Sequence, residues 1–282
     1  MHEWPLIIFT LLVQASVGIT LFTTFSLVLA KQGLGSQEKR RYALPFMLLA
    51  FIFGALGLMV STAHLGYPLN AFHALRHVES SWLSREIIFA SLYLAFLGLG
   101  TLIALISKRL PIGFLLIASL LGIVDVFCMS AIYVHSSVVT WMHFNTYLMF
   151  FGSVLSLGAV ASLWSLAIRP ELPSQLMRKL AVAAVALLIA ITLCRLLVQP
   201  VYAEYLTSVW NSDVVTFPHQ PLDAFAQLAS LRLASSVVLI AGVCALAFCW
   251  RSQRINKRLL TLGSGLIVVA EVLLRVGFFN IQ

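Results

Sequence analysis

Long apolar stretches alternate with short polar loops along the whole chain of 282 residues. A helix needs about 20 apolar residues to cross the hydrocarbon core of a bilayer. Eight segments meet this length, so the pattern predicts an all-α integral membrane protein, with eight transmembrane helices in two four-helix bundles and one polytopic domain over residues 1–282. The predicted spans are about 5–30, 43–63, 86–107, 111–134, 145–168, 180–200, 228–250 and 259–280, with a long loop at about 201–227.

Composition agrees with lipid as the solvent. Hydrophobic residues make up 61% of the sequence and charged residues only 10%, whereas soluble domains have about a quarter of their residues charged. The first apolar stretch has no basic region before it and carries no charge from Pro5 to Ala30, so we interpret it as an uncleaved helix and not as a secretory signal. The net charge of +8 comes from residues between the spans, which argues against binding to nucleic acid.

The distribution of basic residues predicts the orientation. Most of the 18 Lys and Arg residues follow the first, third, fifth or seventh span: Lys31, Lys39, Arg40, Arg41, Lys108, Arg109, Arg169, Arg178, Lys179, Arg251, Arg254, Lys257 and Arg258. The loop 201–227 has no Lys or Arg. Because cytoplasmic loops carry the excess of positive charge, we expect both termini on the periplasmic face of a bacterial inner membrane.

Charged residues inside the predicted spans gather toward one face. With the orientation above, they all lie in the outer halves of their helices: Glu86, Asp125, Arg195, Arg232, Glu271 and Arg275. All seven histidines, His64 and His135 among them, also fall on the outer side. Charges within a membrane are costly, and they are usually paired or functional. The one-sided clustering predicts a polar pocket that opens to the outer face.

Structural explanations exist for each of these charges. Glu271 and Arg275 are four residues apart on one helix face, so they could neutralise each other and fix the last helix to a neighbour. Asp125 could be an interhelical hydrogen-bond anchor. Arg195 and Arg232 could extend their side chains to the outer headgroups.

A redox role fits the outer pocket. A quinol releases protons together with its electrons, so its site needs a hydrogen-bond acceptor and a carboxylate that leads to water. His64 and Glu86 have the right chemistry at the facing ends of consecutive helices. The four cysteines lie inside apolar segments without CxxC spacing, and only His64 with His135 offers a histidine pair, so we expect no haem, iron–sulfur cluster or metal site in this protein.

Two other classes remain open. A transporter usually has a site at the membrane midplane, often at helices broken by Gly or Pro. Here the midplane is nearly bare of charge, and the predicted spans show no proline that interrupts them. The glycines within the second and third spans, Gly54, Gly57, Gly98 and Gly100, indicate close helix packing instead. A purely structural anchor is the third class.

Four motifs resemble the anchor subunits of dimethyl sulfoxide reductase, the DmsC family. The N-terminal motif is His2-Glu3-Trp4-Pro5-Leu6 with Ile8-Phe9-Thr10, and the second is His64-Leu65-Gly66-Tyr67-Pro68 with Ala71-Phe72. The others are Leu83-Ser84-Arg85-Glu86-Ile87 and, in the last span, Ala270-Glu271-Val272 with Arg275-Val276-Gly277-Phe278-Phe279. The helix number and the length match this family along the whole sequence.

The resemblance implies a function and partners. Members of the family hold a molybdopterin catalytic subunit and an iron–sulfur subunit on the periplasmic face, and they oxidise menaquinol in anaerobic respiration while the partner carries out the terminal reduction. It implies quinol-site roles for His64 and Glu86. Under this hypothesis we expect Arg232, Glu271 and Arg275 to shape the pocket.

The sequence also departs from the family pattern. Arg85 stands where a known member has asparagine, and the stretch Trp141–Thr146 differs, so the terminal acceptor stays open. Membrane subunits of polysulfide and nitrite reductases are the nearest alternative family.

Overall fold

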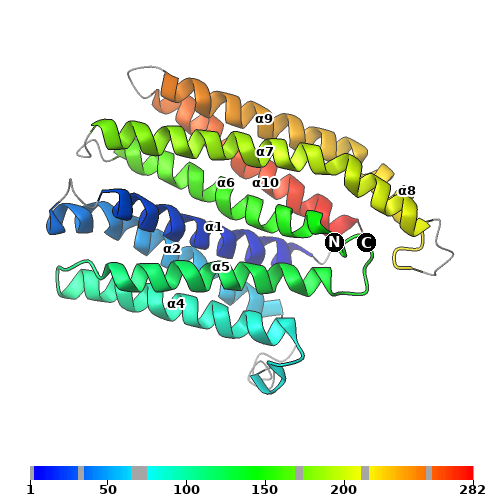
Figure 1. Ribbon diagram of the computed structural model, residues 1–282, viewed down its shortest axis with the longest axis horizontal. Coiled ribbons are helices and arrows are strands. Elements are labelled where there is room, and N and C mark those ends of the chain that lie inside the picture. Colours follow the sequence, from blue (N-terminus) through cyan, green and yellow to red (C-terminus); the bar gives the residue numbers. More distant parts are fainter. Residues whose placement is uncertain are drawn as a thin grey trace.

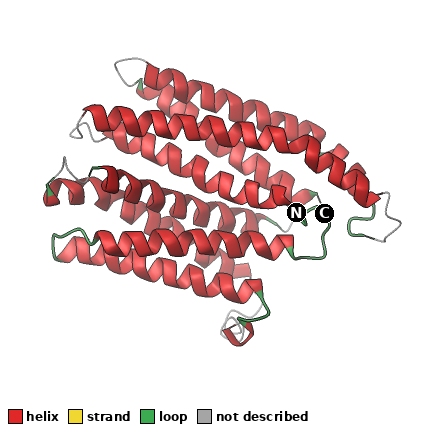
Figure 2. Cartoon of the chain, viewed as in Figure 1, coloured by secondary structure: helices red, strands yellow, loops and turns green. Residues whose placement is uncertain are grey.

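The structure, a computed structural model, describes residues 3–30, 35–64, 75–168, 174–210, 216–251 and 256–281, and nearly all of them are helical (Figure 2). The helices are α1 (Trp4–Leu29), α2 (Ser36–His64), the 3-10 helix η2 (Leu75–His77), α4 (Trp82–Ile106), α5 (Ile112–Val134), α6 (Phe144–Ile168), α7 (Ser174–Trp210), α8 (Pro221–Gln227), α9 (Ala229–Arg251) and α10 (Lys257–Asn280). These described ranges contain no strand, and the predicted all-α class is confirmed.

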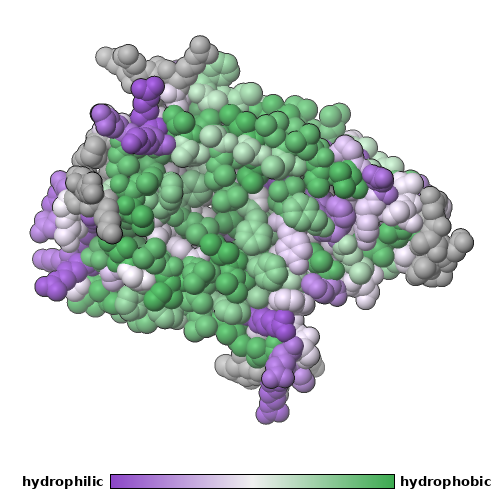
Figure 3. Space-filling model, in the orientation of Figure 1, coloured by the Kyte–Doolittle hydropathy of each residue, from purple (hydrophilic) through white to green (hydrophobic). Residues whose placement is uncertain are grey.

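Eight of the described helices are long and apolar enough to span a membrane, and η2 and α8 are the two that are not. Apolar side chains cover the middle of the molecule, and hydrophilic side chains gather near its two ends (Figure 3). This banding is what a bilayer requires of a protein surface. The prediction of eight transmembrane helices is confirmed, and the protein is a multi-pass membrane protein.

Two boundaries differ from the sequence prediction. Helix α7 continues to Trp210, so Pro200 lies inside it, and part of the predicted loop 201–227 is helical. Helix α2 already begins at Ser36, which places Pro45 inside it as well. The prediction that the helices lack internal proline is therefore wrong. Proline removes one backbone donor and bends a helix without necessarily ending it, and α7 changes direction toward its C-terminal end (Figure 1).

The helices pack as two groups of four (Figure 1). In one group α1 packs on α2 and α5, and α4 packs on α5 and α2; in the other, α6 packs on α7 and α10, and α9 packs on α10 and α7. Contacts of α1 with α6, supported by α5 with α6 and α1 with α10, join the groups. The start of α1 and the end of α10 lie at one end of this array, which we call the terminal end (Figure 1).

Small residues allow the close helix contacts. A Cβ atom added at any of Gly54, Gly57, Gly98 and Gly100 would lie within 3.1 Å of a neighbouring helix's side chain, so the predicted close packing there is confirmed. The closest approach is between α1 and α6. A Cβ on Gly18 would collide with the carbonyl oxygen of Val154, and a Cβ on Gly158 would lie 2.7 Å from the carbonyl oxygen of Gly18. The two groups thus meet backbone to backbone.

We predict that Gly18→Leu destabilises the protein more than an equal substitution at an open position. The leucine forces α1 away from α6, and overpacking of this kind costs about 1 to 3 kcal/mol or more. Gly265→Leu is the matched control, because no atom lies within 4 Å of a Cβ added there on α10. Thermal melting in detergent measures both, and equal melting temperatures for the two variants would contradict the α1–α6 contact.

Candidate functional site

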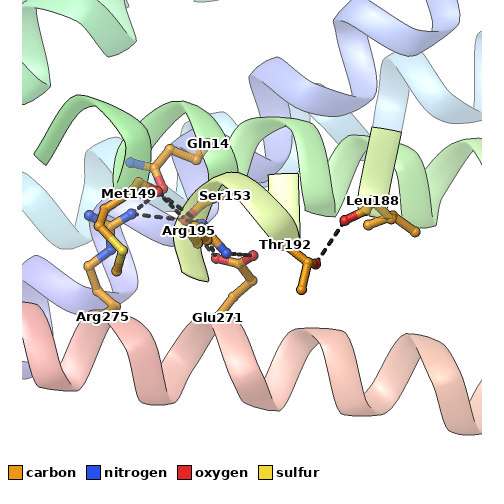
Figure 4. A network of polar contacts seen from close by, with 8 residues as sticks. All are labelled: Gln14, Met149, Ser153, Leu188, Thr192, Arg195, Glu271 and Arg275. Carbon is orange, nitrogen blue, oxygen red and sulfur yellow. Dashed lines mark hydrogen bonds and ion pairs between the residues drawn. The ribbon is translucent and has the colours of Figure 1, made fainter. Parts of the chain in front are cut away.

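A buried ion pair links α7 to α10. The Arg195 guanidinium donates from Nη1 to Oε1 of Glu271 at 2.7 Å and from Nη2 to Oε2 at 3.1 Å. Both side chains are almost fully buried, with exposed fractions of 4% and 1%. Ser153 of α6 donates a third hydrogen bond to Glu271 Oε2 at 2.7 Å, so three helices meet at one carboxylate (Figure 4). The pairing is bidentate, which is the strongest geometry for these two groups.

Arg275 extends the network across the molecule (Figure 4). Its Nη2 donates to Gln14 Oε1 at 2.6 Å and to Ser153 Oγ at 3.1 Å, and its guanidinium lies 4.1 Å from the centre of the Phe150 ring. Gln14 is on α1, and its amide donates to the sulfur of Met129 on α5 at 3.7 Å. Polar contacts therefore run from α7 and α10, through α6, to α1 and α5 in the other group of helices.

The structure differs from two interpretations that the sequence suggested for Glu271 and Arg195. Within the described residues Glu271 pairs with Arg195 and not with Arg275, because the Arg195 guanidinium presents two parallel N–H groups to the carboxylate. Arg195 does not reach for headgroups either, since it is buried against α6. Gly152 makes that position possible, because a Cβ there would lie 2.7 Å from both Nε and Nη2 of Arg195.

A second polar cluster lies between α4 and α5. Glu86 is buried in the first turns of α4, and Asp125 of α5 is buried completely. The two residues lie on adjacent helices, since α4 packs on α5. Neither oxygen of Asp125 has a hydrogen-bond partner in the described part of the protein, so its interpretation as an interhelical hydrogen-bond anchor is wrong there. Burying an unsatisfied carboxyl group is costly, which marks this cluster as a candidate site.

Aromatic and basic side chains lie at the same end of α4 as Glu86. The guanidinium of Arg85 lies 4.3 Å from the centre of the Trp82 ring and donates to the carbonyl oxygens of Val78 and Glu79. The Trp82 ring is 5.3 Å from that of His135. His64 is the last residue of α2, which packs on α4, but its side chain lies outside the described residues, as does the segment 65–74 with the rest of its motif.

A pocket of about 80 Å³ lies near the terminal end, between α7, α8, α9 and α10 and the start of α6. Its walls are mainly apolar, and the polar side chains on them include Arg195, Arg232 and Gln199. Arg232 donates to the carbonyl oxygen of Phe225, and its guanidinium lies 3.2 Å from the centre of that ring. No residue of α1, α2, α4 or α5 lines this pocket.

The predicted site residues thus fall into separate places. Glu86 belongs to the cluster between α4 and α5. Glu271 and Arg275 belong to the network of hydrogen bonds around Arg195 and Ser153, and Arg232 lines the pocket. Sequence reasoning missed Gln14 and Ser153, which accept hydrogen bonds from Arg275 in this network. Gln14 is the one amide within the uncharged first span, and that polarity could have indicated a buried contact.

The segment between α5 and α6 fastens the C-terminus at the terminal end. Thr140 donates to the carbonyl oxygen of Ile281 at 2.9 Å, and the Trp141 indole donates to that of Phe278 at 2.9 Å. The Tyr202 hydroxyl donates to the carbonyl oxygen of Thr140 at 2.6 Å. His143 lies against Tyr202 in the same region, and partial burial lowers its pKa, which favours the neutral ring.

Comparison with known proteins identifies the family. The model of the DMSO reductase anchor subunit family (DmsC) matches residues 1–281. The protein belongs to this family. It is 31% identical over 289 residues to YnfH, an anaerobic dimethyl sulfoxide reductase subunit of Escherichia coli K12, and the match spans all of the present sequence and 95% of YnfH. The C subunit of the anaerobic dimethyl sulfoxide reductase of the same organism is 34% identical over 154 residues, 53% of each sequence.

The corresponding C subunit of Haemophilus influenzae is 31% identical over 166 residues, which are 57% of the present sequence and 58% of that protein. No solved structure matches the protein. The resemblance noted in the sequence is confirmed. Membership in the DmsC family, together with the eight apolar helices, makes the protein a membrane anchor of a DMSO reductase-type complex that associates with catalytic and iron–sulfur subunits.

We predict strong coupling between Arg195 and Glu271. Arg195→Met or Glu271→Leu alone leaves one buried charge without its partner and should cost about 3 to 5 kcal/mol. The double variant removes both charges and should cost clearly less than the sum of the two. Thermal melting of the detergent-solubilised complex measures this cycle, with Glu204→Leu on the exposed face of α7 as a near-neutral control. Additive losses would contradict the pairing.

Proposed function

We propose that this DmsC-family protein is the menaquinol-oxidising anchor of its complex in the bacterial inner membrane. It passes electrons to an iron–sulfur subunit on the periplasmic face, and a molybdopterin subunit carries out the terminal reduction during anaerobic respiration. The single observation that carries the proposal is the burial of two carboxyl groups, Glu86 and Asp125, on the adjacent helices α4 and α5, in a protein that matches the family from end to end.

The proposed orientation of the protein in the membrane rests on the distribution of its basic residues. Most basic residues of the described part lie at the end of the array opposite the terminal end, in the first turns of α2, α7 and α10 or between α4 and α5: Lys39, Arg40, Arg41, Lys108, Arg109, Arg178, Lys179, Lys257 and Arg258. The positive-inside rule makes that end cytoplasmic. The terminal end, with Glu86 close to it, then faces the periplasm, where the electron-accepting partner docks.

In this proposal, His64, Glu86 and Asp125 each have a separate role in releasing the protons of the quinol. Menaquinol, when bound, supplies two electrons and two protons. His64 accepts a hydrogen bond from a hydroxyl group and then its proton, because a neutral imidazole takes up protons near pH 7. Glu86 receives protons and releases them toward periplasmic water, since it lies in the first turns of α4. Asp125 is buried deeper in the membrane, on α5, where its carboxyl group offers a second site for a proton.

Glu271 and Arg275 have a structural role in this proposal. Their hydrogen bonds are made to Arg195, Ser153 and Gln14, so they stabilise the contact between the two groups of helices on which the quinol site is built. Arg232 lies away from this network, on the wall of the pocket.

A test of the site compares His64→Ala and Glu86→Gln in membranes that contain the assembled complex. Removal of a polar partner from the buried site should weaken the binding of a quinol analogue by about tenfold in each variant. Glu204→Gln is the control, because this carboxylate is exposed on α7. Unchanged affinity in both variants, with the complex intact, would leave only the anchor role.

The alternatives are a membrane subunit of a polysulfide or nitrite reductase complex and, with less support, a secondary transporter. Co-purification separates transport from anchoring. We expect the protein extracted in mild detergent to bring with it a partner with the visible absorption of iron–sulfur clusters. A protein that is purified alone under conditions that preserve its eight-helix fold would contradict the anchor function.

A further inference from the structure

The pocket between α7, α8, α9 and α10 carries an uncompensated positive charge. Of its two arginines, Arg195 is neutralised by Glu271 through two hydrogen bonds. Arg232 has no carboxylate within ion-pair distance among the described residues. A lone cation facing an apolar cavity in a membrane is costly, and a bound anion would remove that cost.

The geometry holds the Arg232 guanidinium in place. It stacks on the Phe225 ring at 3.2 Å and donates to the carbonyl oxygen of Phe225, while Ser235 and Ser236 donate to its own backbone carbonyl at 2.9 and 2.8 Å. Helix α8 supplies Phe225, which is buried. A guanidinium fixed in this way loses little freedom when it binds a ligand, and its remaining N–H groups match the oxygens of a phosphate.

The walls of the pocket suit hydrocarbon. They include Leu228, Leu231, Leu239, Leu273 and Leu274. Leu196 also lines the pocket and is 37% exposed, and its neighbour Leu197 is 72% exposed on the same helix, so the pocket borders the surface that faces lipid. Trp210, nearly half exposed on the same helix, is of the type that marks the depth of the headgroups.

We propose that this pocket binds an anionic phospholipid from the leaflet at the terminal end. The phosphodiester accepts hydrogen bonds from Arg232, and the upper part of an acyl chain lies along the leucines. A quinone fits the same walls less well, because it is neutral and leaves the charge of Arg232 uncompensated. The proposal is independent of the quinol site, since no residue of α2 or α4 lines the pocket.

The test uses the assembled complex in nanodiscs of phosphatidylcholine with a minor fraction of phosphatidylglycerol. After release into detergent, native mass spectrometry counts the phosphatidylglycerol that each complex retains. We expect the wild type to retain it in preference to phosphatidylcholine, Arg232→Gln to lose about tenfold of that preference, and Arg232→Lys to keep part of it.

Arg85→Gln is the matched control. Arg85 also lies near the terminal end, stacks on an aromatic ring and donates to backbone carbonyl oxygens, but it does not line the pocket. Its substitution should leave retention unchanged. Gly277→Leu is a second variant that keeps Arg232. A Cβ added at Gly277 makes only ordinary contact with Leu231 at 3.6 Å, and a larger side chain there fills the pocket and should also abolish retention.

Several results would overturn the proposal. Equal retention of the two lipids by the wild type is one, and it needs no variant to fold. Phosphatidylglycerol retention that survives both Arg232→Gln and Gly277→Leu is another. Protection of the wild type against melting by inorganic phosphate, without any preference between the lipids, would assign the site to a free anion. Binding of a quinol analogue that depends on Arg232 but not on Glu86 would assign it to quinol.

Discussion

The carboxylate of Glu271 is the point at which the helices of the second group are joined. It accepts two hydrogen bonds from Arg195 of α7 and one from Ser153 of α6, while it is carried by α10. In lipid there is no water to satisfy any of these groups, so each depends on the others being in place. Removing one partner would leave the rest buried and unsatisfied. The relative positions of α6, α7 and α10 are therefore specified much more narrowly than apolar packing alone would require.

Ser153 also links the second group of helices to the first through Arg275. Ser153 also accepts a hydrogen bond from Arg275, whose second acceptor is Gln14 on α1. Beside this polar link, Gly18 and Gly158 bring the backbones of α1 and α6 together. The link is directional and the glycine contact is steric, and together they fix the register between the groups. The α4–α5 cluster and the pocket lie on opposite sides of this junction, so each can be altered by substitution with little effect on the other.

The eight spans could be predicted from the sequence because a membrane helix needs little more than sufficient apolar length. The burial of Glu86, Asp125, Glu271 and Arg275 agrees with their positions within apolar stretches, whereas Arg195 could equally have extended to the headgroups. Their partners could not be predicted. Arg195 and Glu271 are 76 residues apart, and only the packing of α7 on α6 and α10 brings them together.

Gln14 and Ser153 carry no charge, so nothing in the sequence linked them to the arginines. The extension of α7 beyond Pro200 was missed for another reason. Its last turns contain Glu204, Thr207 and Ser208, which end the apolar stretch without ending the helix. The side chain of His64 remains a sequence prediction.

The length of α7 has a mechanical consequence. Its 37 residues extend about 55 Å at the helical rise, whereas the hydrocarbon core is about 30 Å thick. The last turns, which follow the bend at Pro200, therefore extend beyond the hydrocarbon. Tyr202 and Tyr205 on these turns donate to the carbonyl oxygens of Thr140 and Val139, which links the α5–α6 connection to the C-terminal part of α7. A partner subunit that docks at this end would contact a surface whose distance from the hydrocarbon is set by the C-terminal turns of α7.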